Sequence, residues 1–255
     1  MSKVLDKQSN QKKIERWQIW ADKPEAEGTL VQRAQAKLPE MESTKQLVKL
    51  VSGYYKPGMR VLDAGCNVGH YLRGLRRLDP KLNYTGIDAY ESYISKAKEI
   101  YKDDPLAHFA VKDIFQPLFP EKPFDIVYSC NVLVHLPDFR PPVKNLLEST
   151  KKVCFIRTLF EDFTTIVRKT IDSDLDEKGE PINFAFQNTW SKKLFSKYVE
   201  SLGWKVEFIE DEFNLGILEK EYTTLKKGLG TRILGGKQVD GNIIFNWMWA
   251  KITKA

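Results

Sequence analysis

The feature that most constrains the fold is an alternation, from Met59 onward, of short apolar β-rich segments with amphipathic segments of helical length. This order is typical of right-handed βαβ units around a parallel sheet. Strands are predicted at residues 59–64, 84–87, 107–111, 124–129, 153–159, 204–209 and 243–252. The sequence therefore predicts an α/β fold with a seven-stranded sheet, mostly parallel with a final antiparallel strand.

Helices are predicted between these strands, where the apolar residues recur with a period of 3.6. They cover residues 70–78 and 91–101, a segment beginning near Pro141, and residues 191–201. Asp138 is a candidate cap for the third helix, and Gly203 is expected to end the last one in a left-handed conformation. Helices in these positions would cover both faces of a doubly wound, Rossmann-like sheet.

Three segments lie outside this framework: residues 1–50, which have mostly helical character, and insertions at about 161–190 and 211–241. We expect residues 51–255 to form one domain, because a chain of 255 residues suffices for one sizeable core with additions. Both insertions are expected to leave the sheet at its carboxyl edge, where open α/β sheets bind ligands. They are therefore predicted to form a substrate cap with the N-terminal segment; the alternative is that they are surface loops.

The composition favours a soluble, cytoplasmic protein. No apolar run approaches the roughly 20 residues needed to cross a bilayer, and the first dozen residues lack the apolar stretch of a secretory signal. The three cysteines form no even disulfide set and no CxxC pattern, which favours a reducing compartment. The net charge of +6 is a mild excess on a mixed surface, so nucleic acid is permitted as a partner but not indicated.

The most informative passage is VLDAGCNVGHYL at residues 61–72, where an apolar strand runs through a glycine turn into a helix. Gly65 allows a sharp turn that can approach a ligand, and Gly69 allows the helix to start close to the strand. The glycines are four residues apart and Asp63 precedes them, so the GxGxxG spacing of a dinucleotide site is absent. A carboxylate here suits a ligand with ammonium or sulfonium charge.

This passage resembles the first motif of class I S-adenosylmethionine-dependent methyltransferases of the small-molecule type. Further strand ends resemble that family in chain order: Asp88 at the position that binds the ribose hydroxyls, Asp113-Ile114 at the adenine position, and FDIVYSCNVLVHLPD at residues 124–138. The resemblance implies S-adenosylmethionine as cofactor and S-adenosylhomocysteine as its product. The cofactor-binding residues that it implies are Asp63, Gly65, Cys66, Gly69, Asp88, Ala89, Asp113, Ile114, Ser129 and Cys130. Taken singly, Asp63 could instead cap the helix, and Asp88 and Asp113 could be ordinary turn residues.

His135 is the predicted catalytic base, because it lies just past the fourth strand and a hydroxyl acceptor would benefit from a group with a pKa near neutrality. The alternative is a histidine that packs or caps the following helix. No metal site is predicted, since acidic residues and histidines do not cluster at ligand spacing. The aromatic residues of the N-terminal segment and of the first insertion could stack on a substrate or anchor the cap; they are Trp17, Trp20, Phe184, Phe186 and Trp190.

The sequence thus predicts an enzyme that transfers a methyl group to a hydroxyl of a small molecule or of a sugar or glycan precursor. One alternative keeps the cofactor and takes RNA as the acceptor, and it predicts steeply salt-dependent RNA binding. Another is a catalytically silent nucleoside-binding module, which shares the same residues. An NAD-dependent oxidoreductase is disfavoured by the missing GxGxxG. The sequence leaves the oligomeric state open.

Overall fold

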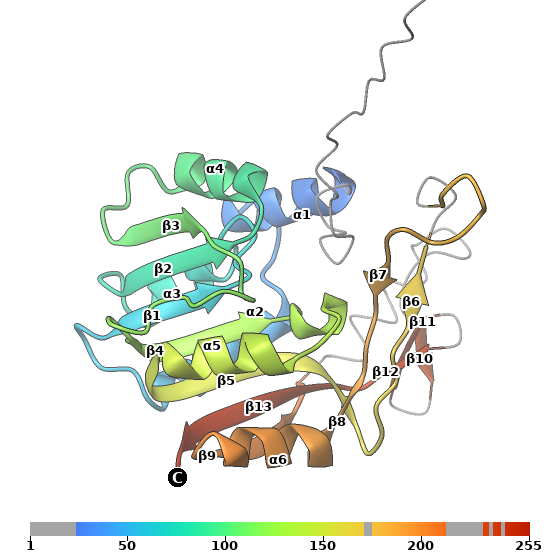
Figure 1. Cartoon of the computed structure of the whole chain (residues 1–255). Helices are drawn as coiled ribbons and strands as arrows, with labels where there is room; N and C mark the ends of the chain where they lie inside the picture. The colour runs from blue at the N-terminus through green and yellow to red at the C-terminus, as the bar shows by residue number, and fades with distance from the viewer. Residues whose placement is uncertain (1–23, 171–174, 213–231, 235–236, 241–242) are drawn as a thin grey trace, which may run out of the picture.

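The computed structural model describes residues 24–170, 175–212, 232–234, 237–240 and 243–255. Its main sheet has the strand order β3-β2-β1-β4-β5-β13-β9, with the two-residue strand β8 beside β5 (Figure 1). The strands are β1 (Arg60–Ala64), β2 (Asn83–Asp88), β3 (Ala107–Val111), β4 (Phe124–Cys130), β5 (Thr150–Glu161), β8 (Trp190–Ser191), β9 (Trp204–Glu210) and β13 (Trp247–Lys254). Strands β1 to β5 are parallel, and β13 is antiparallel to both β5 and β9, which confirms the predicted sheet.

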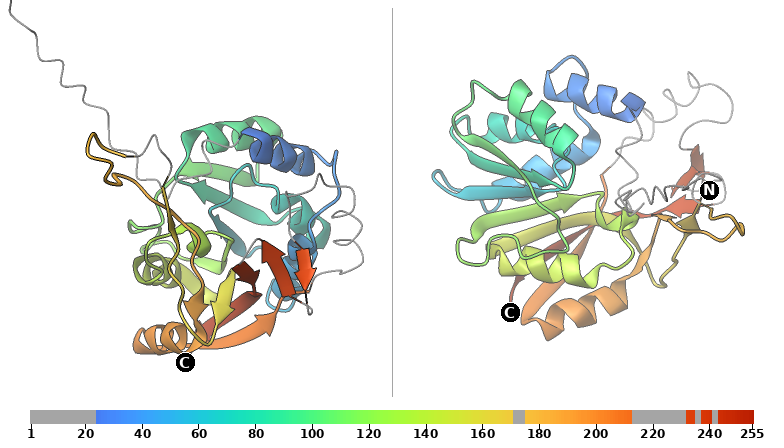
Figure 2. Two further views of the ribbon diagram at one scale, coloured as in Figure 1. Left: turned by 90° about the vertical axis from the view of Figure 1, so that its right-hand side faces the viewer. Right: turned by 45° about the horizontal axis from the view of Figure 1, so that its top comes forward.

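Helices cover both faces of this sheet, as predicted (Figure 2). They are α1 (Pro24–Ala34), α2 (Glu42–Ser52), α3 (Leu72–Leu78), α4 (Glu91–Ile100), α5 (Arg140–Glu148) and α6 (Lys192–Ser201), with a short 3₁₀ turn, η2 (Leu133–His135). Helices α2, α3 and α4 contribute to one apolar cluster, and α5 and α6 contribute to the other.

The two clusters lie on opposite faces because strand side chains alternate in direction. Neighbouring residues of β1, Val61 and Leu62, belong to different clusters, and so do Ile126 and Val127 of β4. Nearly every position of these central strands is buried, so the strands read as continuous apolar runs rather than alternating ones. Helix α2 extends past residue 50, which was the predicted end of the N-terminal segment. Its buried side chain Leu47 belongs to the core of the domain.

The last predicted strand, residues 243–252, is interrupted in the structure. Ile243–Phe245 form β12, which pairs with β11 (Lys237–Asp240), and β11 pairs with β10 (Arg232–Leu234) in a separate small sheet. Asn246 separates β12 from β13: its side-chain amide donates to the Phe160 carbonyl at 2.9 Å, and its carbonyl accepts the Phe160 N–H. A single polar residue such as Asn246 within an otherwise apolar segment does not predict such a change of sheet.

The first insertion forms an antiparallel hairpin of β6 (Arg168–Lys169) and β7 (Ala185–Phe186) that extends beyond the carboxyl ends of the parallel strands (Figure 1). Gly203 has φ of +81°, as expected for the residue that ends α6. Most of the second insertion, together with Trp17 and Trp20, lies outside the described residues. Within the described part, no helix is long and apolar enough to traverse a bilayer.

Candidate active site

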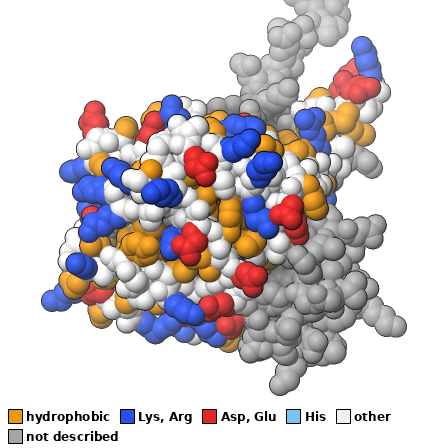
Figure 3. Space-filling view, turned by 90° about the horizontal axis from the view of Figure 1, so that it is seen from below, with side chains coloured by type: hydrophobic (Ala, Val, Ile, Leu, Met, Phe, Trp, Pro, Cys, Tyr) orange, Lys and Arg blue, Asp and Glu red, His pale blue; other side chains and the backbone are white. Residues whose placement is uncertain are grey.

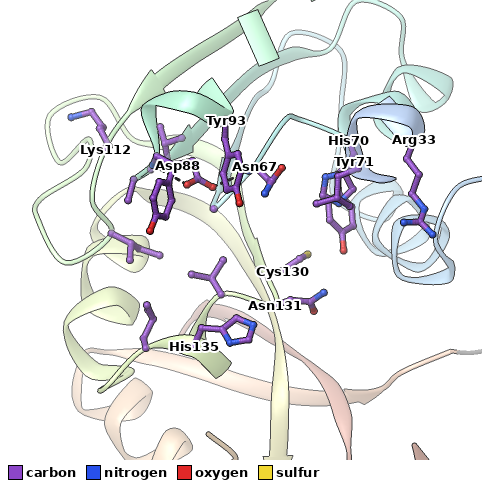
Figure 4. Close-up of a pocket in the computed structure, with 18 of the residues that line it drawn as sticks. Arg33, Asn67, His70, Tyr71, Asp88, Tyr93, Lys112, Cys130, Asn131 and His135 are labelled. Atoms are coloured by element: carbon purple, nitrogen blue, oxygen red, sulfur yellow. Dashed lines mark hydrogen bonds between the residues drawn. The ribbon is translucent and has the colours of Figure 1, made fainter. Parts of the chain in front are cut away.

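A cavity of about 410 Å³ opens at the carboxyl ends of β1, β2 and β4 (Figure 4). Its volume lies within the range of about 300–1,000 Å³ that is typical of small-molecule sites. The walls come from α1, the β1–α3 turn, the end of β2, the loop after β3, and the β4–η2 segment. The lining residues are Thr29, Leu30, Arg33, Met41, Gly65, Asn67, His70, Tyr71, Ile87, Asp88, Ala89, Tyr90, Tyr93, Lys112, Ile114, Cys130, Asn131, Val132, His135 and Leu136.

The β1–α3 turn brings its backbone against the end of β2. The N–H groups of Gly65 and Cys66 both donate to the Ile87 carbonyl, at 2.8 and 2.9 Å. Gly65 has φ of +84°, and a Cβ there would lie 2.2 Å from a methyl carbon of Val132. Only glycine fits a left-handed position with so close a neighbour. The backbone of this turn therefore forms part of the cavity wall.

Asp88 projects from the end of β2 into the cavity (Figure 4). Its carboxylate accepts the N–H of Asn67 at 2.9 Å and the N–H of Tyr90 at 3.1 Å, so each oxygen is held by a backbone donor, and the Ala89 backbone N–H also interacts with this carboxylate. Burial raises the pKa of Asp88 to about 6, and the backbone donors oppose this shift. Hydroxyl groups of a ligand would donate to the oxygens and favour the ionised form.

Asp63, by contrast, lies beneath the turn and not on the cavity wall. It is 1% exposed, and the hydroxyls of Tyr84 and Tyr128 both donate to its Oδ2, at 2.7 and 2.9 Å. Burial raises the pKa of Asp63 to about 7, although the two tyrosine hydrogen bonds act in the opposite direction. Through these two hydrogen bonds, Asp63 joins β1 to the neighbouring strands β2 and β4 close to the turn.

The structure brings six of the predicted site residues to the cavity: Gly65, Asp88, Ala89, Ile114, Cys130 and His135. The other five do not line it. Gly69 packs against Phe109, where a Cβ would lie 2.9 Å from the ring, and the buried Ser129 hydroxyl donates to the Ala64 carbonyl. Asp113 accepts the N–H of Phe115, while its chain neighbours line the cavity.

The predicted cysteines are buried thiols. Cys66 belongs to the turn but does not line the cavity, whereas Cys130 does line it. All three cysteines of the chain are free. Burial raises the pKa of the Cys66 and Cys130 thiols well above the ordinary value. A protonated, buried thiol is a poor nucleophile, so these side chains act as apolar packing groups. Among the described residues, no three His, Cys, Asp or Glu side chains are placed to hold a metal ion.

His135 ends the η2 turn on the side of the cavity opposite Asp88 (Figure 4). Its Nδ1 lies 3.2 Å from the backbone carbonyl of Phe186 in the first insertion. Because a carbonyl only accepts hydrogen bonds, Nδ1 carries the proton in this contact, and Nε2 is then the basic nitrogen of the neutral ring.

The first insertion also fixes the rest of the η2 turn. The Asn188 N–H donates to the Val134 carbonyl and its side-chain amide donates to the Leu136 carbonyl, both at 2.8 Å. The Trp190 indole donates to the Leu133 carbonyl at 3.2 Å, and this ring is buried in the core. Trp190 therefore anchors the insertion to the domain, which is the second of the two roles considered for these aromatic residues.

A buried ion pair that sequence reasoning missed supports the wall beside His135. Arg157 of β5 forms two hydrogen bonds with Asp211, at 2.7 and 2.6 Å, and donates a third to Oδ1 of the cavity residue Asn131 at 2.5 Å. The side chains of Arg157 and Asp211 are 8% and 5% exposed. The sequence signal for this ion pair was the arginine within the apolar run of β5, because a buried charged side chain almost always has a partner of opposite charge.

The comparisons with known proteins agree with this geometry. A family profile described as "Methyltransferase domain" matches residues 62–155. The chain is 29% identical over 169 residues to 2-methyl-6-phytyl-1,4-hydroquinone methyltransferase of Synechocystis sp., covering 66% of this chain and 49% of that protein. It is 35% identical over 86 residues to cycloartenol-C-24-methyltransferase of Arabidopsis thaliana, covering 32% of this chain and 25% of that protein. The chain thus spans half or less of the length of these relatives.

Solved structures of low sequence identity share the fold. The CcbJ methyltransferase from Streptomyces caelestis superposes with a TM-score of 0.55 at 11% identity, covering 86% of this chain and 94% of that one. An O-methyltransferase family protein from Burkholderia thailandensis gives a TM-score of 0.55 at 13% identity, covering 94% of this chain and 63% of that one.

Proposed function

The chain carries a class I S-adenosylmethionine-dependent methyltransferase domain, and from this premise we propose that it transfers the methyl group of S-adenosylmethionine to a hydroxyl of a small molecule. The observation that supports this proposal best is the position of Asp88 in the cavity. Its carboxylate stands at the end of β2 inside the cavity, where its oxygens can accept ribose hydroxyls besides the backbone donors that orient them.

The role proposed for His135 is that of a general base. Methyl transfer to oxygen forms an O–C bond and breaks the C–S bond, whose electrons remain on sulfur. The hydroxyl proton must leave the oxygen as the new bond forms, and Nε2 of His135 is the basic nitrogen when Nδ1 donates to Phe186. Proton acceptance at this position removes the positive charge that would otherwise develop on the acceptor oxygen.

The acceptor class that the cavity favours has an apolar body. Apolar and aromatic side chains make up much of the wall, among them Leu30, Met41, Tyr93 and Val132. The two relatives are named for methyl transfer to a phytyl-substituted hydroquinone and to cycloartenol. We propose an apolar or aromatic metabolite that presents its hydroxyl to His135, and a sugar or glycan precursor remains a competing acceptor. The reduced cysteines fit a cytoplasmic location for this reaction.

Cofactor binding is the first test. Calorimetry with S-adenosylhomocysteine should give clear binding to the wild-type protein, and Asp88→Ala should weaken it by about 100-fold, because two charge-assisted hydrogen bonds are lost. Asp103→Ala, an exposed aspartate after α4, is the matched control and should bind normally. Absence of wild-type binding would end the proposal, and equal affinity in Asp88→Ala would remove Asp88 from the ribose role.

Turnover is the second test, because a silent nucleoside-binding module would pass the first. Incubation of the protein with methyl-labelled cofactor and a metabolite extract should give a labelled product that is absent with Asp88→Ala. The same reaction with total RNA separates the alternative acceptor, since RNA binding would weaken steeply with salt. Label that enters RNA and no small molecule would contradict the proposed acceptor class.

A further inference from the structure

Asn131 lines the cavity with a side chain whose orientation is fixed. It directly follows β4 and has φ of +61°, in the left-handed region that asparagine adopts more readily than most residues. Its backbone N–H donates to the carbonyl of Arg157 at 2.9 Å, and its Oδ1 accepts a hydrogen bond from Nη1 of Arg157 at 2.5 Å. Because a guanidinium only donates hydrogen bonds, the atom of the amide that faces Arg157 is the oxygen.

The amide nitrogen of Asn131 is therefore available to a bound molecule. Nδ2 carries two N–H groups and can only donate, and within the part of the chain that the structure describes no group accepts a hydrogen bond from it. Asn131 is partly exposed, and the space that it lines is the cavity. A donor in this position indicates an oxygen of a ligand as its partner.

A buried ion pair holds the amide in this orientation. Arg157 forms two hydrogen bonds with Asp211, and its guanidinium carbon lies 4.4 Å from the centroid of the Trp247 ring. The guanidinium is thus fixed from two sides. Turning the Asn131 amide over would bring its N–H groups against those of Arg157 and leave both sets of donors without an acceptor, which is costly in a buried position. The N–H groups of Asn131 therefore stay directed away from Arg157.

Asn131 and His135 have opposite hydrogen-bonding character. Both belong to the segment that runs from the end of β4 through η2, and both line the cavity on the side across from Asp88 (Figure 4). Nε2 of His135 accepts a proton when Nδ1 donates to the Phe186 carbonyl, whereas Nδ2 of Asn131 donates. An acceptor atom that meets both side chains must donate to His135 and accept from Asn131.

A hydroxyl group meets both requirements during methyl transfer, and an amine does not. The hydroxyl oxygen has two lone pairs. One accepts the N–H of Asn131, and the other forms the new bond to the methyl carbon. The C–S bond breaks with its electrons remaining on sulfur, and the hydroxyl proton passes to Nε2 of His135. A neutral amine has one lone pair, so Asn131 would compete with the methyl carbon for it.

We propose that Asn131 orients the acceptor hydroxyl through a hydrogen bond from Nδ2 and thereby selects oxygen over nitrogen as the atom that is methylated. Arg157 is the positioning residue that keeps the Asn131 amide in the donating orientation. This inference rests on the proposed function, because it requires methyl transfer in the same cavity with His135 as the base. It adds the residue that distinguishes the acceptor atom.

Asn131→Asp tests the donor with little change in shape. Aspartate keeps an oxygen for Arg157 and also tolerates a left-handed conformation, but it offers the cavity an acceptor in place of a donor. Methyl-labelled cofactor is incubated with the protein and a metabolite extract. Mild alkali removes methyl esters, and hot hydriodic acid then releases the label of O-methyl ethers as volatile methyl iodide and leaves N-methyl groups bound. We expect volatile label from the wild type and about 10- to 100-fold less from Asn131→Asp.

The affinity for S-adenosylhomocysteine, measured by calorimetry, should change by less than about 2-fold in Asn131→Asp, which also shows that the variant is folded. Asn83→Asp is the matched control, because Asn83 begins β2 at the end of the strand opposite Asp88, and it should behave as the wild type. Undiminished O-methylation by Asn131→Asp, or an equal loss of cofactor affinity, would overturn the proposal. Wild-type protein that gave no volatile label would instead contradict the proposed function.

A double-mutant cycle tests the positioning role of Arg157. Arg157→Lys keeps a positive charge for Asp211 but lacks the planar fork that also reaches Asn131, so O-methylation should fall by about 3- to 10-fold. In Asn131→Gly, where glycine suits the positive φ and no amide remains, the same Arg157→Lys change should have an effect below about 2-fold. Equal effects in the two backgrounds would show that Arg157 acts through the fold and would overturn its positioning role.

Discussion

The two sides of the cavity are held in place in different ways. On the cofactor side, Asp88 is oriented by Asn67 and Tyr90, which belong to the adjoining turn and to the residues just after β2. On the acceptor side, His135 and its turn are held by Phe186 and Asn188, from an insertion about 50 residues further along the chain. The Asp88 side is therefore held by contacts within the segment that matches the methyltransferase profile, and the His135 side is held by an insertion outside that segment.

The profile match ends at residue 155, before the insertion residues that hold His135. The match therefore covers the residues that hold Asp88 and none of the insertion residues that hold His135. Figure 3 shows the molecule from below, and on this one face Lys and Arg side chains are interspersed with Asp and Glu side chains. Four variants test the contrast between the two sides.

His135→Ala should give the largest effect, because it removes the proposed base and leaves the cofactor side intact. Turnover should fall by about 10²- to 10⁴-fold, which is the usual contribution of general-base catalysis. The affinity for S-adenosylhomocysteine should change little. Labelled methyl transfer and calorimetry measure the two quantities, and a variant with undiminished turnover would assign His135 to packing.

Asp211→Ala tests the anchor of the acceptor wall and should lower the free energy of unfolding by about 3–5 kcal/mol, since it leaves Arg157 buried without its anion. Glu212→Ala is the matched control: its ion pair with Lys49 is exposed, and loss of such a pair costs about 0–1 kcal/mol. Urea denaturation measures both. Equal losses in the two variants would show that the buried Arg157 pair contributes no more to the free energy of unfolding than the exposed Lys49 pair does.

Asp63→Asn tests how the buried carboxyl group of Asp63, behind the cofactor side of the cavity, makes the free energy of unfolding depend on pH. Because the folded pKa is about 7 and thus raised, the folded protein keeps a proton between pH 4 and 7 that the unfolded chain has released. The free energy of unfolding should therefore fall as pH rises through this window, by up to about 4 kcal/mol. Asparagine still offers one oxygen to both tyrosines but does not titrate, so the variant should lose the part of the slope that Asp63 contributes and keep the part that comes from the raised pKa of Asp88, whereas Asp103→Asn should keep both parts. Urea denaturation at pH 4 to 8 decides the matter, and an unchanged slope in Asp63→Asn would contradict the shift.

Asn188→Ala should give the smallest change, because it loosens the turn that carries His135 without removing the base. We expect turnover to fall by about 10-fold through misplacement of His135, with S-adenosylhomocysteine affinity unaltered. Gln187→Ala is the control, since its side chain bonds only to the exposed Lys169 among its described contacts. A loss of cofactor affinity in Asn188→Ala would mean that the two sides are coupled more tightly than their hydrogen bonds indicate.

Sequence patterns predicted the parallel sheet and its helices because the alternation of strand and helix periods is local and strong. They also located the cavity edge, since the carboxyl ends of parallel strands meet at one edge of a sheet. They did not separate the residues on the wall, such as Asp88, from those behind it, such as Asp63, because both aspartates lie within one residue of the end of a strand and differ in tertiary burial.

The order of strands and helices and the glycine turn were determined by the sequence itself, because backbone conformation and apolar periodicity act over a few residues. Only the tertiary structure decided that Arg33 and His70 line the same cavity, that Arg157 pairs with Asp211, and that Phe186 orients His135. These contacts join residues 37 to 54 positions apart, and their energies depend on burial, which no local pattern of residues records.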